Sequence, residues 1–276
     1  MRGTVVYKMS ASGNDFVMID GRTSSVSDWT PERIRRVCAR RTGIGADGVA
    51  IIEPGSTPEA IKFTYFNRDG HRAPMCGNAS LCAVRLAARL ELAPADAMVL
   101  ETDIGPIPAR VLPGNGEMAE ITFPDVIGLT VPDIEVAPGE RSIHLVKVGV
   151  PHLVVVVDAI DAPAAAPDVR GRALRSHRVL GPEGANVNFV GCNNGIWKIR
   201  TYERGVEAET LACGTGAVAA AATLAKIGHV DLPWSVQTTS GALLEVSGTP
   251  TRDPLHRLAE PRLAGEARMI LRGVLL

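Results

Sequence analysis

Two similar stretches of the sequence decide the fold: YFNRDGHRAPMCGNA at residues 65–79 and YERGVEAETLACGTG at residues 202–216. In each, a strand-like segment with a tyrosine is followed eleven residues later by a cysteine, then by a glycine and the small residues of a helix. Cys76 and Cys213 lie about half of the 276-residue chain apart, as a duplicated domain would place them. The spacing alone leaves duplication and coincidence both open.

Helical spacing predicts three helices. The first covers residues 31–41 with Pro31 in its first turn, the second covers residues 77–92 before Pro94, and the third covers residues 214–227 before Gly228. The third helix is alanine-rich and apolar on every side, which is typical of a helix buried at the centre of a domain.

Short apolar or alternating runs between glycine, proline and aspartate predict strands, which dominate the first half of the chain. The proline-containing stretch at residues 124–138 is the natural crossover between two halves, and the last strand could return to either half. The predicted strands are residues 5–7, 16–19, 49–52, 61–66, 98–101, 120–123, 144–148, 153–157 and 268–276.

Composition excludes several classes of partner. The 29 basic and 30 acidic residues give a net charge of −1, which disfavours nucleic acid and anionic membranes. Apolar runs stay well short of the roughly 20 residues that span a bilayer, and no signal-peptide pattern is visible, so we expect a cytoplasmic protein with no membrane partner. Five cysteines, an odd number at scattered positions, predict reduced thiols.

Three familiar kinds of cofactor site find little support. The GIGADG segment at residues 43–48 has the glycine spacing of a dinucleotide fingerprint, but it follows a helix-like segment and precedes a strand, so it predicts a helix-to-strand turn. No phosphate loop or metal-binding motif is present, and no metal site is expected. None of the five lysines has the context of a Schiff-base lysine, so pyridoxal phosphate is not expected.

The candidate reactive groups are the two cysteines that precede a glycine at the start of a predicted helix. A helix N-terminus presents unpaired N–H groups and a partial positive charge, which can lower the pKa of a thiol and bind a carboxylate. A single cysteine before a helix is more often inert packing. Two cysteines in matched settings, Cys76 and Cys213, favour a functional role for both.

Two thiols that face one pocket could invert a carbon centre. A thiolate on one face removes the α-proton of an amino acid and a thiol on the other face delivers one, while helix N-termini stabilise the carboxylate as it takes on charge. This chemistry needs no cofactor. A single cysteine acting with a histidine would indicate nucleophilic hydrolysis instead, but the second matched cysteine would then have no role.

Further segments complete a recognisable pattern: KMSASGNDF at residues 8–16, FNRDG at 66–70, MCGN at 75–78, PEGANVNF at 182–189 and LACGTG at 211–216. From near the N-terminus to about residue 227, the chain resembles the diaminopimelate epimerase family. The resemblance implies an α/β fold of two pseudo-symmetric domains, each a mixed, largely antiparallel sheet wrapped around a central helix, with the active site in the cleft between them. The implied domains are residues 1–124, joined by a C-terminal strand at 265–276, and residues 125–264. Relatives also suggest a homodimer.

The resemblance implies a role for each matching residue. Cys76 and Cys213 would be the two bases, acting on opposite faces of the α-carbon of LL- or meso-diaminopimelate, and His152 and Glu203 would tune their protonation. On their own, these last two residues would be read as a capping histidine and a solvated ion pair, and the asparagines as turn residues. The implied substrate-binding residues are Asn14, Asn67, Gly77, Asn78, Asn186, Glu203, Arg204, Gly214 and Thr215.

Three departures from the family pattern bear on the substrate. Residues 10–12 replace the more usual His-Gly-Leu, Gly48 stands where many relatives have glutamine, and Val150 stands where many have asparagine. The lost amides would remove hydrogen bonds to a substrate, each contributing roughly 0.5–1.5 kcal/mol.

The sequence therefore predicts a cofactor-independent epimerase of diaminopimelate, serving the synthesis of lysine and peptidoglycan precursors. A racemase of another amino acid, such as histidine, is the alternative. A catalytically silent binding protein of this fold is disfavoured because both thiols are present. Cys38, Cys82 and Cys192 receive no role.

Overall fold

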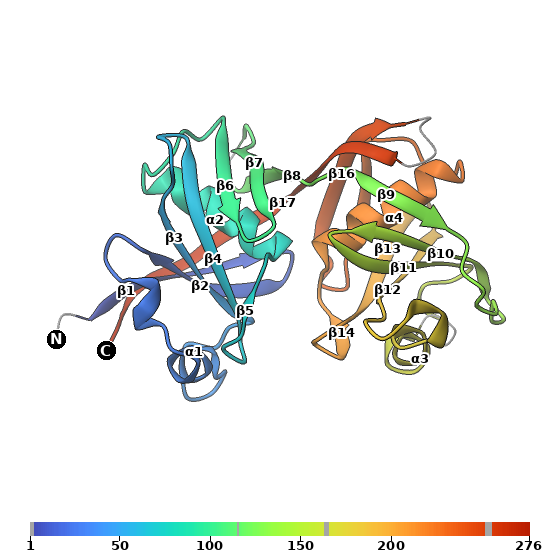
Figure 1. Ribbon diagram of the computed structural model, residues 1–276, viewed down its shortest axis with the longest axis horizontal. Coiled ribbons are helices and arrows are strands. Elements are labelled where there is room, and N and C mark those ends of the chain that lie inside the picture. The colour runs from blue at the N-terminus through green and yellow to red at the C-terminus, as the bar shows by residue number, and fades with distance from the viewer. Residues whose placement is uncertain (1–2, 115, 163–165, 252–255) are drawn as a thin grey trace. The chain divides into compact units, whose positions relative to one another are not determined.

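The protein is described by a computed structural model that covers residues 3–114, 116–162, 166–251 and 256–276, with the side chains of residues 256 and 257 left undescribed. Contacts divide the chain into an N-terminal unit, Met1–Thr122 with Ala264–Leu276, and a C-terminal unit, Phe123–Leu263. Each unit is a mixed sheet with a central helix, α2 in the first and α4 in the second (Figure 1). The predicted α/β fold class is confirmed.

In the N-terminal unit, a mixed sheet surrounds α2 (Gly77–Arg89). Antiparallel pairs join β1 to β2, β3 to β4, β6 to β7 and β7 to β8, whereas β2–β3 and β4–β6 are parallel. Ten residues of α2 are buried, which fixes it at the centre. The other elements are β1 (Thr4–Ala11), β2 (Asn14–Asp20), η1 (Val26–Asp28), α1 (Pro31–Cys38), β3 (Gly48–Pro54), β4 (Ala60–Asn67), β5 (Arg72–Ala73), β6 (Met98–Thr102), β7 (Gly105–Val111) and β8 (Met118–Thr122).

The C-terminal unit repeats this order around α4 (Gly214–Lys226). Antiparallel pairs join β10 to β11, β12 to β13 and β15 to β16, whereas β11–β12 and β13–β15 are parallel. Its other elements are β9 (Val126–Thr130), β10 (Glu140–Val148), β11 (Val150–Val157), η3 (Pro167–Gly171), α3 (Arg172–Arg175), η4 (Arg178–Leu180), β12 (Asn186–Asn193), β13 (Ile196–Glu203), β14 (Ala208–Thr210), β15 (Trp234–Gln237) and β16 (Leu243–Pro250).

The strand β17 (His256–Leu275) runs through both units. Near its start it pairs with β9 of the C-terminal unit, and over its last part it pairs with the whole length of β1 in the N-terminal unit. The terminal strand predicted at residues 268–276 is therefore the second part of a longer strand.

The strand registers confirm the duplication but shift the predicted correspondence by one residue. Phe66 lies opposite Val49, and Tyr202 lies opposite Val187. Val49 and Val187 each follow the first residue that pairs with the preceding parallel strand, so Tyr202 matches Phe66 and not Tyr65. Both Phe66 and Tyr202 pack on the outer face of their sheets, away from the central helix. The equal eleven-residue spacing to the cysteines misleads because the connection before α4 is one residue longer than the one before α2.

Most predicted elements are found, and the differences have local causes. The first helix ends at Cys38, not at residue 41, because the carbonyls of Val37 and Cys38 accept hydrogen bonds from the N–H groups of Gly45 and Ala46, both at 3.1 Å. The turn predicted at residues 43–48 is confirmed, since β3 begins at Gly48. The second helix ends at Arg89, three residues early.

Several strands were missing from the prediction, among them β7, β12, β15 and β16. Prolines and glycines inside β7 and β16 and asparagines inside β12 obscure the apolar alternation that predicts a strand. The predicted burial of the third helix is confirmed, because ten of the thirteen residues of α4 are buried. In the part of the chain that the structure describes, no helix is long and apolar enough to cross a membrane.

Candidate active site

Cys76 occupies the N-cap position of α2. Its backbone is extended, with φ −139° and ψ 118°, its carbonyl accepts a hydrogen bond from the Ser80 N–H at 2.8 Å, and its side chain does not cap the helix. The thiol belongs to a partly exposed residue. Cys76 therefore stands where the positive end of the helix dipole favours an anion.

A chain of amides ties the first turn of α2 to the sheet. The buried Asn78 donates from Nδ2 to Asn14 Oδ1 at 2.9 Å, and Asn14 donates from its own Nδ2 to Asp47 Oδ2 at 3.0 Å. Arg40 then pairs with Asp47 at 2.6 Å and with Asp15 at 2.8 Å. The predicted residues Asn14 and Asn78 are thus in contact with each other, and their orientation is fixed by charged neighbours.

The positive charges of Arg40 and Lys8 stabilise the ionised carboxylate of Asp15. Burial opposes the ionised carboxylate, but hydrogen bonds from Arg40 and Lys8 outweigh it and lower the pKa of Asp15. The same burial acts on Cys38 and raises the pKa of that thiol to about 11. Cys38 is therefore a packed, protonated residue at neutral pH.

Asn67 and Gly48 face each other at the end of the same sheet. The side chain of Asn67 is exposed, whereas Gly48 is buried. A Cβ atom at Gly48 would lie 2.6 Å from both Cε2 and Oη of Tyr65. The ring of Tyr65 thus fills the space that a side chain at position 48 would need. Tyr65 was not predicted to belong to the site.

Cys213 repeats the geometry of Cys76 in the C-terminal unit. It is the N-cap of α4 with φ −127° and ψ 109°, and its carbonyl accepts from the Ala217 N–H at 3.0 Å. The Sγ atom lies 3.5 Å from Oγ1 of Thr215, and the residue is buried. Thr215, predicted as a substrate-binding residue, therefore lies beside the Cys213 thiol within this unit.

His152 is fully buried, so the surface or capping role that its sequence context suggests is wrong. Its Nδ1 lies 3.2 Å from Nδ2 of Asn188, while its Nε2 is buried and has no hydrogen-bond partner among the described residues. Burial, and secondarily the charge of Arg204, lowers the pKa of His152 to about 3. The imidazole is therefore neutral at physiological pH.

Three further predicted residues lie beside His152 at one end of the sheet. His152 is in register with Asn186 across β11 and β12, and the next residue of β12, Val187, pairs with Tyr202 of β13, the residue just before Glu203. Asn186 Oδ1 accepts from the backbone N–H of Arg204 at 2.7 Å, and Arg204 Nη1 lies 3.5 Å from Glu183 Oε2. The half-buried Glu203 ends β13.

Asn188 and Thr201, which were not predicted from the sequence, lie beside His152 and Asn186 in the same sheet. Asn188 is two residues after Asn186 in β12 and therefore on the same face, a signal that strand alternation could have given. A Cβ atom at Gly216 would lie 2.2 Å from Asn188 Oδ1, so the first turn of α4 packs directly on Asn188. The row formed by His152, Asn186 and Glu203 thus lies at the end of the sheet where α4 begins.

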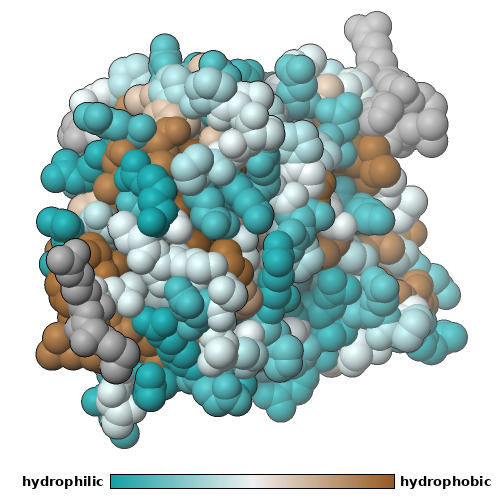
Figure 2. Space-filling model, turned by 60° about the vertical axis from the view of Figure 1, so that its left-hand side comes forward, coloured by the Kyte–Doolittle hydropathy of each residue, from teal (hydrophilic) through white to brown (hydrophobic). Residues whose placement is uncertain are grey.

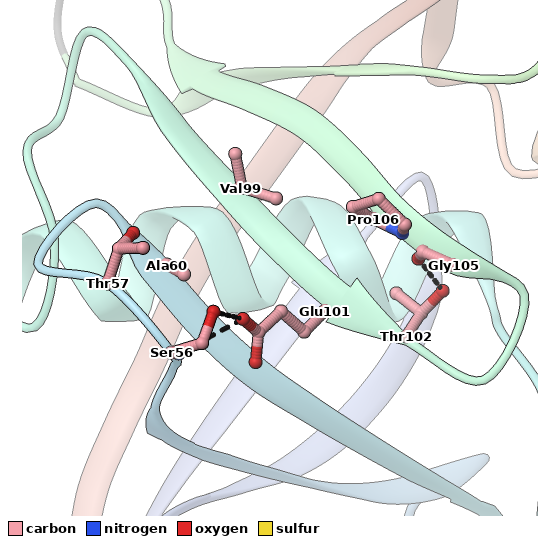
Figure 3. A pocket seen from close by; sticks show the side chains of 8 residues that line it. All are labelled: Ser56, Thr57, Ala60, Val99, Glu101, Thr102, Gly105 and Pro106. Carbon is pink, nitrogen blue, oxygen red and sulfur yellow. Dashed lines mark hydrogen bonds between the residues drawn. The ribbon is translucent and has the colours of Figure 1, made fainter.

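Other candidate sites carry none of the predicted residues. A depression of about 420 Å³ is lined by β4, β6, β7 and the turn after β3, where Glu101 accepts hydrogen bonds from Ser56 (Figure 3). In the described ranges, no group of three or more His, Cys, Asp or Glu side chains is placed to hold a metal ion.

The sequence is similar to a known protein family and to curated proteins over most of its length. The family model described as "Diaminopimelate epimerase" matches residues 6–122 and 144–249. A diaminopimelate epimerase of Gemmatimonas aurantiaca is 41% identical over 278 residues, covering 96% of this chain and 97% of that protein. A second diaminopimelate epimerase, from Aquifex aeolicus, is 39% identical and covers 97% of this chain and 96% of its own.

Solved structures show the same fold at low sequence identity. A PhzF-family phenazine biosynthesis protein of Bacillus anthracis superposes with a TM-score of 0.74 at 15% identity, covering 100% of both chains. A probable proline racemase from Agrobacterium radiobacter gives a TM-score of 0.71 at 17% identity, covering 99% of this chain and 93% of that one. The two-unit architecture is therefore shared with these proteins.

Proposed function

The chain belongs to the diaminopimelate epimerase family and is an isomerase, and from that premise we propose that it interconverts LL- and meso-2,6-diaminopimelate without a cofactor. The observation that carries the proposal is the matched placement of two cysteines. Cys76 and Cys213 are both extended N-cap residues of the central helix of their unit. Such a placement provides two thiols, each beside an anion-binding helix terminus.

The proposed reaction transfers one proton off the α-carbon and one onto it. The thiolate of one cysteine removes the α-proton, and the thiol of the other donates a proton to the opposite face. The roles exchange in the reverse direction. The N–H groups of Gly77 and Asn78, and of Gly214 and Thr215, are proposed to stabilise the carboxylate while negative charge develops on it.

The remaining residues are proposed to hold the substrate and adjust the thiols. Glu203 and His152 are proposed to tune the protonation of the cysteines, with Glu203 also contacting the substrate. Asn14, Asn67, Asn186 and Arg204 are proposed to bind its amine and carboxylate groups. The buried, neutral state of His152 supports a role as a polar neighbour and not as a permanent cation. The reaction would serve the synthesis of lysine and peptidoglycan precursors in the cytoplasm.

Incubation of the reduced protein with LL-diaminopimelate in deuterated water tests this proposal. We expect the meso product to appear with solvent deuterium at the inverted α-carbon. Cys76→Ala and Cys213→Ala should each abolish epimerisation, and full activity of either variant would end the two-base mechanism. Cys192→Ala, which changes an exposed thiol, is the matched control and should retain activity.

A racemase of another amino acid is the second candidate, and position 48 is the observation that favours it. Gly48 offers no amide to a substrate, and Tyr65 occupies the space beside it. Parallel incubations with L-histidine and other L-amino acids decide between the two. Exchange at the α-carbon of one of these, with diaminopimelate left unchanged, would establish the altered substrate, and exchange with none would favour a binding protein.

We also propose a homodimer. Hydrophobic side chains gather in several places on the face that Figure 2 shows, and β17 exposes Ile270, Leu271 and Val274 in its last part, at 56%, 48% and 57%. Association of two copies would remove such side chains from water. Light scattering coupled to size-exclusion chromatography should give twice the mass of the 29.1 kDa chain. A mass of one chain at micromolar concentration would contradict the proposal.

A further inference from the structure

A buried chain of three polar side chains lies beneath the first turn of α4. Thr201 Oγ1 donates to Asn188 Oδ1 at 3.0 Å, and Asn188 Nδ2 lies 3.0 Å from the carbonyl oxygen of Leu153 and 3.2 Å from His152 Nδ1. Asn188 and His152 are fully buried, and Thr201 is 3% exposed. Water is therefore unavailable to rearrange these bonds.

The orientation of the Asn188 amide follows from its neighbours. A backbone carbonyl oxygen can only accept hydrogen bonds, so the amide atom beside Leu153 must be the NH₂ group. The same NH₂ group faces His152 Nδ1. A proton on Nδ1 would then point at another donor, so Nδ1 must be the accepting nitrogen of the ring.

We propose that Asn188 is a positioning residue that holds His152 in the tautomer with its proton on Nε2, so that the imidazole enters the reaction as a hydrogen-bond donor and not as a proton acceptor. Nε2 is the ring nitrogen that is buried and without a partner among the described residues. Because none of the described residues accepts a hydrogen bond from Nε2, we infer that this donor serves a substrate carboxylate or a thiolate. This role rests on the proposed epimerase function.

The corresponding positions of the N-terminal unit hold no histidine and asparagine pair. By register, Phe16 and Ala50 correspond to His152 and Asn188, and Tyr65 corresponds to Thr201. An apolar ring and a methyl group thus replace the imidazole and the amide. The two cysteines therefore differ in their surroundings although their N-cap geometry is the same.

Burial supports the same assignment from an independent direction. Removal of His152 from water disfavours its cationic form, and the neighbouring positive charge of Arg204 adds to the effect. A ring that stays neutral carries a single proton, and Asn188 determines which nitrogen holds it. To act as a base at Nε2, the ring would need the tautomer that places Nδ1–H against the amide donor.

The tautomer can be measured directly on the full chain. Long-range ¹H–¹⁵N correlation spectra of the reduced protein, labelled with ¹⁵N-histidine, distinguish Nε2–H, Nδ1–H and imidazolium forms, and His152→Gln assigns the signal among the six histidines. We expect the Nε2–H pattern at neutral pH. An Nδ1–H or imidazolium pattern would overturn the proposal.

Asn188→Asp tests the positioning role. The carboxylate would accept a hydrogen bond from Nδ1–H, so the signal should move to the Nδ1–H or imidazolium pattern. Turnover should fall by about tenfold or more, as expected when an active-site imidazole is held in the wrong tautomer, with a much smaller change in KM. Unchanged turnover after the tautomer has moved would overturn the donor role. Asn193→Asp changes an exposed residue of the same strand and should alter neither the tautomer of His152 nor the turnover.

A second variant covers the case in which Asn188→Asp does not fold. Circular dichroism decides whether each variant is folded. The serine of Asn188→Ser is too short to hold both His152 and Leu153, so a mixture of tautomers is expected, and a single Nε2–H pattern would overturn the role of Asn188. Because the tautomer is read without substrate, a wild-type protein that epimerises no diaminopimelate would overturn the proposed function and leave this result standing.

Discussion

At the scale of single residues, the structure changes how position 48 is understood. The absence of a side chain at Gly48 is a packing requirement, because the ring of Tyr65 lies where a Cβ atom would be. Tyr65 is itself held by a stacked contact with Phe63 and an edge-on contact with Phe16, at centroid distances of 6.4 and 6.1 Å. The ring therefore cannot move aside without disturbing its neighbours.

Gly48→Ala should destabilise the protein by about 1–3 kcal/mol, because the added methyl group meets the Tyr65 ring and the Phe66 carbonyl, each at 2.6 Å. Urea unfolding measures the change. Gly273→Ala is the matched control in a strand, since its Cβ atom would meet nothing closer than 3.6 Å. Equal stability losses in the two variants would contradict the packing role of Gly48.

The burial of His152 predicts that acid destabilises the folded state. The pKa of His152 is about 3 when folded and about 6.5 when unfolded, so below pH 6.5 the unfolded chain binds a proton that the folded chain does not. The contribution of this residue is therefore complete above about pH 6.5 and is lost toward pH 3, with a limiting slope of about 1.4 kcal/mol per pH unit.

Free energies of unfolding, measured between these pH values, should fall less steeply for His152→Gln than for the wild type. Identical pH dependence of the wild type and His152→Gln would show that His152 is not the titrating group.

At the scale of elements, position along α2 decides the character of its two cysteines. Cys76 is the partly exposed N-cap, whereas Cys82 lies inside the helix and is fully buried. Burial, and then the nearby Cys76, strongly raises the pKa of the Cys82 thiol. The same helix thus carries one partly exposed cysteine at its N-terminus and one buried cysteine that acts as a small apolar side chain.

Alkylation of the native protein should therefore modify Cys82 about a hundredfold or more slowly than Cys192, because Cys82 is buried with a raised thiol pKa whereas Cys192 is exposed. Mass spectrometry of the digested protein measures each site. In urea the two rates should become similar. Rapid modification of Cys82 in the native state would contradict its buried placement.

At the scale of the whole molecule, β17 makes the folding of the N-terminal unit depend on the end of the chain. Its last part pairs with every residue of β1, which contributes the buried side chains of Val6, Met9 and Ala11. A unit that begins with the first strand therefore becomes complete only with the last one.

Truncation after Leu263 should leave the C-terminal unit protected and unfold the N-terminal unit, because β1 loses the hydrogen bonds of its partner strand. Hydrogen exchange read by mass spectrometry checks this for each strand. Removal of the exposed Leu276 alone should change nothing. Continued protection of β1 in the longer truncation would contradict the dependence.

The sequence by itself determined the three main helices, part of the strands, and the residue types at the start of each central helix. Periodicity gives the three main helices, and a cysteine, a glycine and small residues mark the start of each central helix, because caps and apolar faces are local properties. Motifs shared with the family point to Asn14, His152 and Glu203.

Only the tertiary structure decided which side chains meet. The contact of Tyr65 with Gly48, the hydrogen bonds of Asn188 and the complete burial of His152 depend on strand register and on the approach of a helix to a sheet. These contacts join residues that are 13 to 36 positions apart in the sequence. Register is set by the packing of all strands together, and no short stretch of sequence carries that information.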